Sequence, residues 1–387
     1  MGASLITKEL EEYLIKMRRH FHRHPELSLQ EAETERRICE ELDQMGIPWV
    51  HIDPHNVIGI LEGEPGEKRL CIRGDIDALP MQEQTDLEFK SVNDGVMHAC
   101  GHDAHTAITL TAAKYLAEHH EGMRGTIYFV FQGAEEIGDH GAYDVMPYLR
   151  EQGITMALGM HTWEQMKSGT ICVEEGPRAA GTIMFDITVK GRGSHGSRPD
   201  LGVDPIRPAA NMIEAISSIP SNMHYAQDPL VVNVARIKAG TTANNVIPET
   251  ANFGGTIRYF NPKSDQELVA LMKRIVEHIA AAYGASTDIE TTFSCEPVFN
   301  SKEAAEVSER AVQQIEGLTM VHHDADVGSD DFYLYTKEFG GMYAHLGTGN
   351  GRPDQYAQHH PKYHVDEEPL KYGAEYYVRF AKEYLGF

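Results

Sequence analysis

The densest group of side chains able to bind a metal lies in residues 97–106, which read MHACGHDAHT. Cys100 and His102 are separated by one glycine, and a turn there allows both side chains to face one centre. A thiolate and an imidazole together suit zinc or another first-row transition metal. We expect Asp103 to cap the helix that follows, His105 to lie about one turn into it, and both to support the metal ligands from behind. The alternative is an ordinary loop with solvated histidines and a core cysteine.

Two further segments place acids and a histidine at the ends of predicted strands. Glu135 and Glu136 directly follow a strand-like run, and His161 ends another. Ligands of open α/β sheets gather at the carboxyl ends of strands. One carboxylate of such a pair can bind a metal while its neighbour stays free as a general base. Considered singly, the acids also fit a solvated helix start, and His161 fits a structural role.

A fourth group, His359 and His360, lies far away in the sequence, just before the last predicted helix. Alone, it fits a polar loop. All four groups, however, fall at strand ends or loops of one α/β region, and together they supply one Cys, three His and two Glu. That set matches a two-metal hydrolase with five ligands, one unligated base and open positions for water and substrate.

Alternating strands and helices must position these groups. Apolar strands that alternate with helices indicate an α/β sheet of parallel strands covered on both faces. Ser28 and Glu31 form the pattern of a helix N-cap, and Gly46 ends that helix. The periodicity predicts helices at residues 7–22, 28–46, 103–119, 303–316 and 367–384, and strands at 56–61, 70–73, 126–131, 156–160 and 342–346.

The pattern changes near Gly181, where a β-α-β-β-α-β order begins that suits a ferredoxin-like α+β fold with an antiparallel sheet. We therefore expect a discontinuous catalytic domain, residues 1–178 and 296–387, interrupted by a smaller domain at residues 179–295. The elements of this insert are strands at 182–190, 230–237, 251–260 and 287–292, and helices at 204–219 and 264–283.

The composition excludes several classes of protein. The chain has 387 residues, with 34 Lys+Arg against 58 Asp+Glu and a formal net charge of −24. A nucleic-acid or anionic-membrane partner needs clustered basic residues, so neither is expected. The N-terminal segment lacks the apolar core of a signal peptide, and no stretch approaches a membrane span. The five cysteines are widely spread, which favours reduced thiols and a soluble, cytoplasmic protein.

The sequence resembles a known family. It is similar to the metal-dependent amidohydrolase branch of hippurate hydrolases, N-acyl-amino-acid deacylases and plant hydrolases of auxin (IAA)–amino-acid conjugates, relatives of the aminoacylases and glutamate carboxypeptidases. The resemblance covers nearly the whole chain. It rests on HRHPELSLQE (22–31), RGDIDALP (73–80), MHACGHDAHT (97–106), GAEE (133–136), GMHTW (159–163), GRGSHGSRPDLGVDPI (191–206), NNVIPE (244–249), GGTIR (254–258), GSDDF (328–332) and HHPKYHVDEE (359–368).

The resemblance implies roles for the residues of the four groups. Glu135 would be the general base that takes a proton from water and delivers it to the leaving amine. The family's order of His, one variable residue and Pro favours His359 over His360 as a ligand. The two divalent ions would be Zn, Mn, Co or Ni. Their implied ligands are Cys100 (a candidate bridge between the ions), His102, Glu136, His161 and His359.

The resemblance also implies a di-metal aminopeptidase-like fold whose insert is a lid and dimerisation domain, and hence a homodimer or a dimer-based homo-oligomer. His195 in the insert would reach the partner subunit's active site and polarise the scissile carbonyl. Asn245 and Arg258 would lie near the substrate, where Arg can pair with a carboxylate. A salt bridge on a strand is the alternative for Arg258. Asp77 would orient a metal ligand from behind.

The implied activity is hydrolysis of the amide bond of N-acyl amino acids. A dipeptidase or aminopeptidase with the same metals is one alternative, and Asp330 or Asp331 would then hold the free α-amine. A catalytically idle relative that binds small molecules is the other. Gly133 stands where the family commonly has Pro, which is expected to relax the loop that presents the base. His140 and His360 lie near the predicted site with no role that the sequence assigns.

Overall fold

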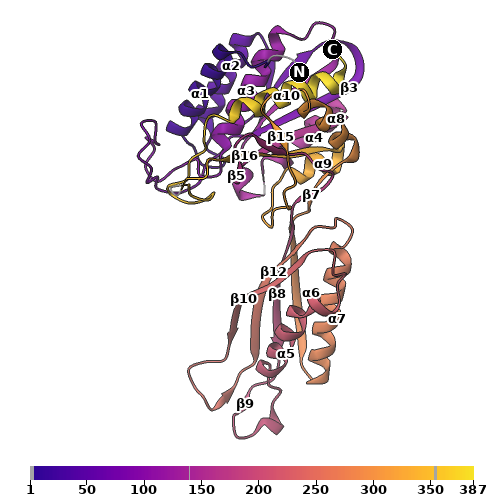
Figure 1. The fold of residues 1–387 in the computed structure, drawn as a ribbon. Helices are drawn as coiled ribbons and strands as arrows, with labels where there is room; N and C mark the ends of the chain where they lie inside the picture. The colour runs from indigo at the N-terminus through magenta and orange to yellow at the C-terminus, as the bar shows by residue number, and fades with distance from the viewer. Residues whose placement is uncertain (1–3, 139, 353–354) are drawn as a thin grey trace. The chain divides into compact units, whose positions relative to one another are not determined.

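The chain is described by a computed structural model that covers residues 4–138, 140–352 and 355–387 and divides into two compact units (Figure 1). Unit 1 comprises Met1–Arg178, Val298–Asp324 and Asp330–Phe387. Unit 2 comprises Ala179–Pro297 and Ala325–Ser329. Among the described residues, no helix is long and apolar enough to cross a membrane.

Unit 1 is built on an eight-stranded sheet. Four neighbouring strands, β4, β3, β5 and β16, run parallel, as the sequence predicts. The pairs β1–β2, β2–β4 and β16–β6 are antiparallel, so the sheet is mixed, with parallel strands at its centre. Parallel neighbours need a long crossover connection, and only residues 53–55 join β1 to β2. The strands, in spatial order, are β1 Trp49–Ile52, β2 Asn56–Glu62, β4 Arg124–Gln132, β3 Glu64–Asp75, β5 Met156–Lys167, β16 Gly341–Gly349, β6 Thr170–Cys172 and β15 Thr319–Met320.

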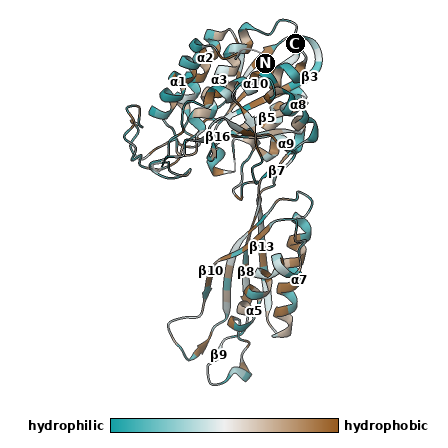
Figure 2. Cartoon of the chain, in the orientation of Figure 1, coloured by the Kyte–Doolittle hydropathy of each residue, from teal (hydrophilic) through white to brown (hydrophobic). Residues whose placement is uncertain are grey.

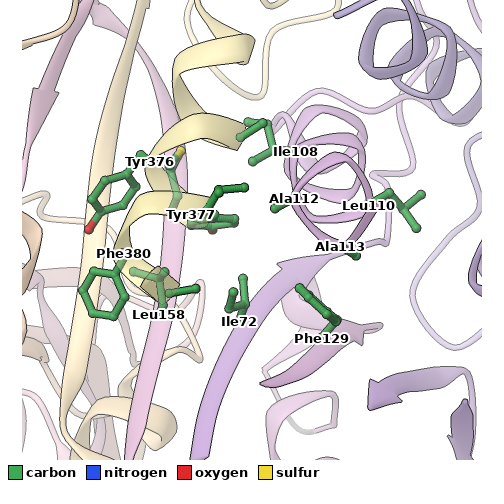
Figure 3. Close-up of a cluster of buried hydrophobic side chains, with 14 of the residues drawn as sticks. Ile72, Ile108, Leu110, Ala112, Ala113, Phe129, Leu158, Tyr376, Tyr377 and Phe380 are labelled. Atoms are coloured by element: carbon green, nitrogen blue, oxygen red, sulfur yellow. The ribbon is translucent and has the colours of Figure 1, made fainter. Parts of the chain in front are cut away.

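One face of this sheet carries the main apolar core. Helices α3 (His102–Glu118) and α10 (Leu370–Leu385) pack against each other and against β3, β4 and β5. Figure 3 shows part of this core, with Ile72, Phe129 and Leu158 of the strands below side chains of the two helices. The helix α3 is buried along nearly its whole length, which fixes the position of its N-terminus at the sheet edge.

The opposite face is covered by a shorter helix. Leu158 and Met160 belong to the first core, so the residue between them points to the other side of the sheet. That residue is Gly159, and a Cβ there would stand 2.7 Å from the ring of Phe332, which precedes α9 (Tyr333–Phe339). Both faces of the sheet are therefore covered, as predicted. Unit 1 also contains helices α4 Ala142–Gln152 and α8 Lys302–Val312 and a small sheet that pairs β7 Gly176–Ala179 with β14 Val298–Asn300.

The outer helices α1 (Lys8–Arg23) and α2 (Ala32–Met45) are largely hydrophilic, as Figure 2 shows. The end of α2 at Gly46 is as predicted, with φ 69°. Its start is not, because the helix begins at Ala32 and Ser28 does not cap it. The Glu26 carboxylate accepts the N–H groups of Glu33 (3.2 Å) and Thr34 (2.7 Å) in place of the predicted cap. The side chains of Ser28 and Glu31 are thus available for other contacts.

Unit 2 has the predicted β-α-β-β-α-β order, and its four-stranded sheet is antiparallel throughout. Alternate residues of β8, among them Ile183 and Val189, point into a core that α5 and α7 complete. The sheet order is β10 Leu230–Ala239, β12 Thr250–Tyr259, β8 Gly181–Lys190 and β13 Ser286–Cys295, with helices α5 Ile206–Ser217, α6 Ile219–Asn222 and α7 Asp265–Ala282 and a small sheet of β9 Ser194–His195 with β11 Val246–Ile247.

Candidate metal centre

Cys100 and His102 lie in the turn that leads into α3. The helix begins at His102, with Gly101 as its N-cap at φ 106°. A Cβ on Gly101 would also stand 2.5 Å from Thr162 Oγ1, so both the backbone angle and the available space require glycine. Cys100 and His102 are both buried. The glycine turn that the sequence predicts is therefore present.

Glu135 and Glu136 lie in a short 3-10 helix, Glu135–Ile137, that follows β4. Ala134 before them has φ 56°, a left-handed conformation that turns the chain sharply after the strand. Glu135 Oε2 lies 3.9 Å from His102 Nε2, and Glu136 Oε1 lies 3.7 Å from His359 Nε2. The two neighbouring acids thus face different histidines.

His161 and His359 complete the group. His161 lies within β5, which continues beyond it, so the prediction that a strand ends there was wrong. Its pairing register with β3 places it level with Asp75, the last residue of β3, and its Nε2 is 3.4 Å from Cys100 Sγ. His359 has φ 62°, and its N–H donates to the Ala99 carbonyl at 2.8 Å, beside the cysteine turn.

Segments that are far apart in the sequence therefore converge. Within each of three groups, the donor atoms all lie within 4.8 Å of one another. The cysteine belongs to two of these groups. The groups are Cys100 with His102 and His161, Cys100 with Glu136 and His359, and His102 with Glu135 and Glu136. The structure brings together all five predicted ligands and the predicted base.

The hydrogen bonds of two histidines leave one ring nitrogen of each free to bind a metal. His102 Nδ1 lies 3.0 Å from the Asp77 carbonyl oxygen, and His161 Nδ1 lies 2.8 Å from the Thr162 carbonyl oxygen. A carbonyl oxygen can only accept, so each Nδ1 carries the hydrogen, and in the neutral ring each Nε2 presents a lone pair. Burial lowers the pKa of His161 well below its usual value, which keeps this ring neutral.

The donor atoms also show the need for a cation. Within the described part of the chain, His102 Nε2 and Glu136 Oε1 are buried without a hydrogen-bond partner. Burial and the nearby Glu136 raise the pKa of the Cys100 thiol well above its usual value. A divalent cation would satisfy both orphaned atoms and stabilise the thiolate. Sulfur, nitrogen and carboxylate oxygen together fit the first-row transition metals that the sequence predicts.

Two of the three residues predicted to support the ligands contact this group. Asp77 Oδ1 lies 3.2 Å from His102 Nδ1, beside the carbonyl contact of the same residue. His105 Nδ1 lies 2.6 Å from Asp75 Oδ1, and its Nε2 accepts the Thr162 N–H at 2.9 Å. His105 therefore joins the end of β3 to β5 behind the ligands.

Asp103 does not have its predicted role. The N-cap of α3 is Gly101, so Asp103 lies inside the first turn and does not cap the helix. Its Oδ2 lies 2.8 Å from His22 Nδ1 and 3.0 Å from Arg18 Nε. Both partners belong to α1, so this carboxylate joins α1 to α3 and is not in place to orient a predicted ligand.

The Asp77→Asn variant is expected to bind metal about 10- to 100-fold more weakly than wild type. The amide bears no charge, and its NH₂ group can face the Nδ1–H of His102, which loosens the ring. A competition titration against a chelating dye measures the affinity. The exposed Asp53 supplies the matched control, because Asp53→Asn makes the same chemical change at a side chain that pairs with His51 and not with a predicted ligand. Equal affinities for both variants would contradict the support role.

A buried ion cluster lies beside Glu135. Arg73 pairs with Asp75, and its Nη2 lies 2.7 Å from Asp331 Oδ1 and 3.7 Å from Asp330 Oδ1. Asp331 Oδ2 also accepts from Gln132 Nε2 at 2.5 Å. Both acids are buried and engaged, so neither is free to hold the α-amine of a peptide, which is the role that the dipeptidase alternative needs.

The same cluster affects the predicted base. One oxygen each of Glu135, Asp330 and Asp331 lie within 4.8 Å of one another. Burial, followed by the charges of the two aspartates, raises the pKa of Glu135 well above its usual value. A raised pKa suits a carboxylate that must accept a proton near neutral pH and then release it.

Replacing Arg73 with Met is expected to destabilise unit 1 by about 3–5 kcal/mol, because it leaves buried carboxylates without their counter-charge. Urea denaturation of the full-length protein, followed by circular dichroism, measures the free energy of unfolding. Arg150→Met is the control, since the Arg150–Glu338 pair (2.8 Å) is half-exposed and is worth at most about 1 kcal/mol. Equal losses of unfolding free energy in the two variants would show that the buried cluster stabilises the protein no more than an exposed ion pair does.

The predicted residues of unit 2 are not all close to one another. His195 and Asn245 line one open cavity of about 640 Å³. Arg258 lies near the other end of β12, where its Nη1 donates to Thr182 Oγ1 at 2.5 Å. From Thr250 to Arg258 a strand spans about 26 Å. Within one chain, Arg258 and His195 therefore cannot touch the same small substrate.

Two histidines without an assigned role have local partners. His140 Nδ1 lies 3.4 Å from Asp144 Oδ2, four residues along the chain. The His360 ring stacks on Tyr356, with the ring centres 4.4 Å apart. These contacts give both a local structural role. Two residues that the sequence does not mark as part of the site, Glu31 and Asn56, contact the loop carrying the glutamates. Because Glu31 fits a helix cap equally well, its motif alone gives no signal of this contact.

Comparison with known proteins agrees with this geometry. Residues 71–383 match the family model described as Peptidase family M20/M25/M40. The chain is 37% identical over 379 residues to the N-acetylcysteine deacetylase of Bacillus subtilis, covering 97% of this chain and 98% of that protein. It is 35% identical over 374 residues to thermostable carboxypeptidase 2 of Saccharolobus solfataricus, covering 95% and 94%.

A solved structure shares the fold over almost the whole length. The crystal structure of a Bacillus subtilis protein described as a dinuclear metal-binding peptidase of the M20 family has a TM-score of 0.87, at 35% identity, covering 98% of this chain and 99% of that one. The predicted ligands converge in this chain, and both sequence and fold match along nearly its full length. The chain therefore belongs to Peptidase family M20/M25/M40.

Proposed function

We propose that this protein hydrolyses the amide bond of N-acyl amino acids with the help of two divalent metal ions. The convergence of five donor side chains beside a glutamate that is not needed as a ligand carries the proposal. The relative named as an N-acetylcysteine deacetylase supports the substrate class. The relative named as a carboxypeptidase suggests the same bond type, an amide to an amino acid with a free carboxylate.

The donor groups suggest how the chain would hold the two ions. Two of the three donor groups share Cys100 Sγ, so Cys100 with His102 and His161 would hold one ion, and Cys100 with Glu136 and His359 would hold the other. Zn, Mn, Co or Ni would fit these donors. When bound, such ions polarise the carbonyl and lower the pKa of water.

Glu135 would move the proton. It is part of the same cluster but is left over once the five donors are assigned, and its raised pKa favours proton uptake. It would take a proton from the attacking water and deliver it to the nitrogen of the leaving amino acid. Only the side chain of Glu135 needs to shift between these steps, because the backbone of its loop is held by buried carboxylates.

Unit 2 would act as the lid and dimerisation domain, and unit 1 as the catalytic domain. The exposed His195 has a Ser197 N–H donating to its Nδ1 at 3.1 Å, which places the hydrogen of the neutral ring on Nε2. An Nε2–H that points into solvent can stabilise the oxyanion in the active site of a second copy of the chain. Since Arg258 is far from His195 within one chain, we propose that the two residues reach a given substrate from different copies.

Arg258 and Asn245 would bind the substrate, with Arg258 pairing with its carboxylate. The net charge of −24 would slightly oppose the approach of such an anion, so attraction must act at short range. All five cysteines are free and buried, which suits a reducing compartment, and we propose the cytoplasm.

A substrate panel tests the proposed reaction. The purified protein, with its bound metal measured, is given N-acetyl and N-benzoyl amino acids, the corresponding amino-acid amides and dipeptides, and the release of free amine is followed. We expect N-acyl amino acids to be turned over and the amides, which lack a carboxylate, to be poor substrates. Preference for dipeptides would indicate a peptidase, and no turnover by the metal-loaded protein would indicate an idle binding relative.

A further inference from the structure

The loop that carries both glutamates has an unusual backbone. We define the glutamate loop as residues 133–138, between β4 and the residues that lead into α4. Ala134 has φ 56°, which costs a residue other than glycine about 1 kcal/mol, and Gly138 has φ 71°. Such a conformation persists only where neighbouring contacts fix it. The groups that hold this loop therefore decide where Glu135 stands.

Glu31 makes the contact at the start of the loop. This residue is fully buried, and its Oε1 accepts the Ala134 N–H at 2.9 Å. A Cβ on Gly133 would stand 2.8 Å from the same oxygen, so the carboxylate comes this close only because residue 133 has no side chain. The Gly133 N–H donates to Asn56 Oδ1 at 3.0 Å. The expectation that Gly133 relaxes the loop is therefore not supported.

Asp77 makes the next contact, and the same N-terminal segment reaches it. Asp77 Oδ2 accepts the Glu136 N–H at 3.1 Å and the Ser28 hydroxyl at 2.7 Å. Two buried carboxylates thus hold two backbone N–H groups on either side of Glu135. Among the described residues, Glu31 Oε2 has no hydrogen-bond partner, so only one oxygen of Glu31 is used.

We propose that Glu31 is a positioning residue that fixes the glutamate loop through the Ala134 N–H and thereby places Glu135. The inference rests on the proposed function, in which Glu135 moves the proton. Glu31 acts as a hydrogen-bond acceptor and not as a charge, because one oxygen makes the contact and the other makes none. An uncharged acceptor of the same shape must then be able to replace it.

Two substitutions separate these roles. Glu31→Leu removes the acceptor and is expected to lower kcat by about tenfold or more with an unchanged KM, since a small displacement of a catalytic group costs up to about 100-fold. Glu31→Gln keeps an acceptor oxygen towards Ala134, and its kcat is expected to stay close to wild type. Metal content is expected to be unchanged in both. Hydrogen–deuterium exchange of the peptide containing residues 133–138 is expected to be faster in the Leu variant only.

Glu41, in the helix α2 that follows Glu31, supplies the matched control. It is buried, pairs with Arg37 and accepts from Tyr13 at 2.8 Å, away from the glutamate loop. Glu41→Leu removes a buried carboxylate of the same kind, and we expect lower stability with unchanged kcat and unchanged exchange in the loop. A loss of kcat in Glu41→Leu equal to that in Glu31→Leu would overturn the proposal.

Gly133→Ala tests the same contact from the other side. Its Cβ would displace the Glu31 carboxylate from Ala134, so we expect a similar loss of kcat. The losses in the Glu31→Leu/Gly133→Ala double variant are expected not to add, because both remove one interaction. If Glu31→Leu does not fold, Gly133→Ala decides the question alone.

Further results would overturn the inference, and a separate one would overturn the function on which it rests. A wild-type kcat in Glu31→Leu or in Gly133→Ala would show that the contact does not place Glu135. A loss in Glu31→Gln as large as in Glu31→Leu would show that charge matters. The Glu135→Gln variant distinguishes the two claims. If this variant retains turnover, the proposed function is wrong. If it loses turnover while the Glu31 variants have a normal kcat, only the positioning role is wrong.

Discussion

Replacing Glu135 with Gln is expected to lower kcat by about 10²- to 10⁴-fold, the usual contribution of a general base. Gln has the same shape but can neither accept the proton of the water nor return it to the leaving amine. Metal content is expected to be unchanged, because Glu135 is assigned as the base and is not one of the five predicted ligands. Removal of one buried carboxylate also reduces repulsion with Asp330 and Asp331, so the variant is expected to be at least as stable as wild type.

Its neighbour provides the sharpest comparison. Glu136→Gln makes the same chemical change one residue along the chain, but Glu136 Oε1 is an orphaned buried atom that faces His359. We expect this variant to lose metal along with activity. Mass spectrometry of the bound metal, together with amine release at saturating N-acyl amino acid, distinguishes the two. Metal loss in Glu135→Gln, or retained turnover, would show that the roles of the two glutamates are assigned wrongly.

The sequence predicts the cluster because its members depend on short local patterns. A glycine between Cys100 and His102 permits a turn with positive φ, and Gly101 has such a conformation, with φ 106°. Glu135 and Glu136 follow an apolar run long enough to be recognised as a buried strand. For His161 the predicted strand end was wrong, yet the register with β3 still places it at the level of the carboxyl ends.

Polar side chains that can either cap a helix or bind a distant partner could not be assigned from the sequence. Ser28 and Glu31 fit a capping box, but Glu26 accepts the first N–H groups of α2 and frees both for the glutamate loop and its support. Asp103 fits an N-cap, but Gly101 takes that place and the carboxylate pairs with α1. Local propensity cannot decide between a cap and a partner about 80 residues away, such as His22.

The separation of Arg258 from His195 is a matter of strand length. The family resemblance places Arg258 and His195 near the substrate. A short motif, however, does not show which end of a strand its residues occupy. The antiparallel register shows it, because Arg258 pairs with Thr182 at the start of β8 and Thr250 pairs with Lys190 at its end. A strand of this length makes the second copy of the chain a requirement of the proposed chemistry.

Removal of the metal ions is the second change with a large expected effect. Incubation with a strong chelator is expected to abolish turnover and to lower Tm, and re-addition of zinc or manganese is expected to restore both. Ions that bind only the folded protein at a hundred times their Kd stabilise it by about 2.7 kcal/mol. Calorimetry of the apo and metal-loaded protein measures this shift. A Tm that does not change on chelation would contradict a metal site formed by the folded chain.

The number of ions lost on substitution tests how they are held. Cys100 Sγ belongs to two of the three donor groups, whereas His161 and His359 each belong to one. Cys100→Ala is therefore expected to lose both ions, and His161→Ala or His359→Ala to keep one that binds more weakly. Cys39→Ala is the matched control, because Cys39 is also a free, buried thiol but lies in α2. Two ions retained in Cys100→Ala would exclude a bridging thiolate, and the remaining donors would then have to hold each ion separately.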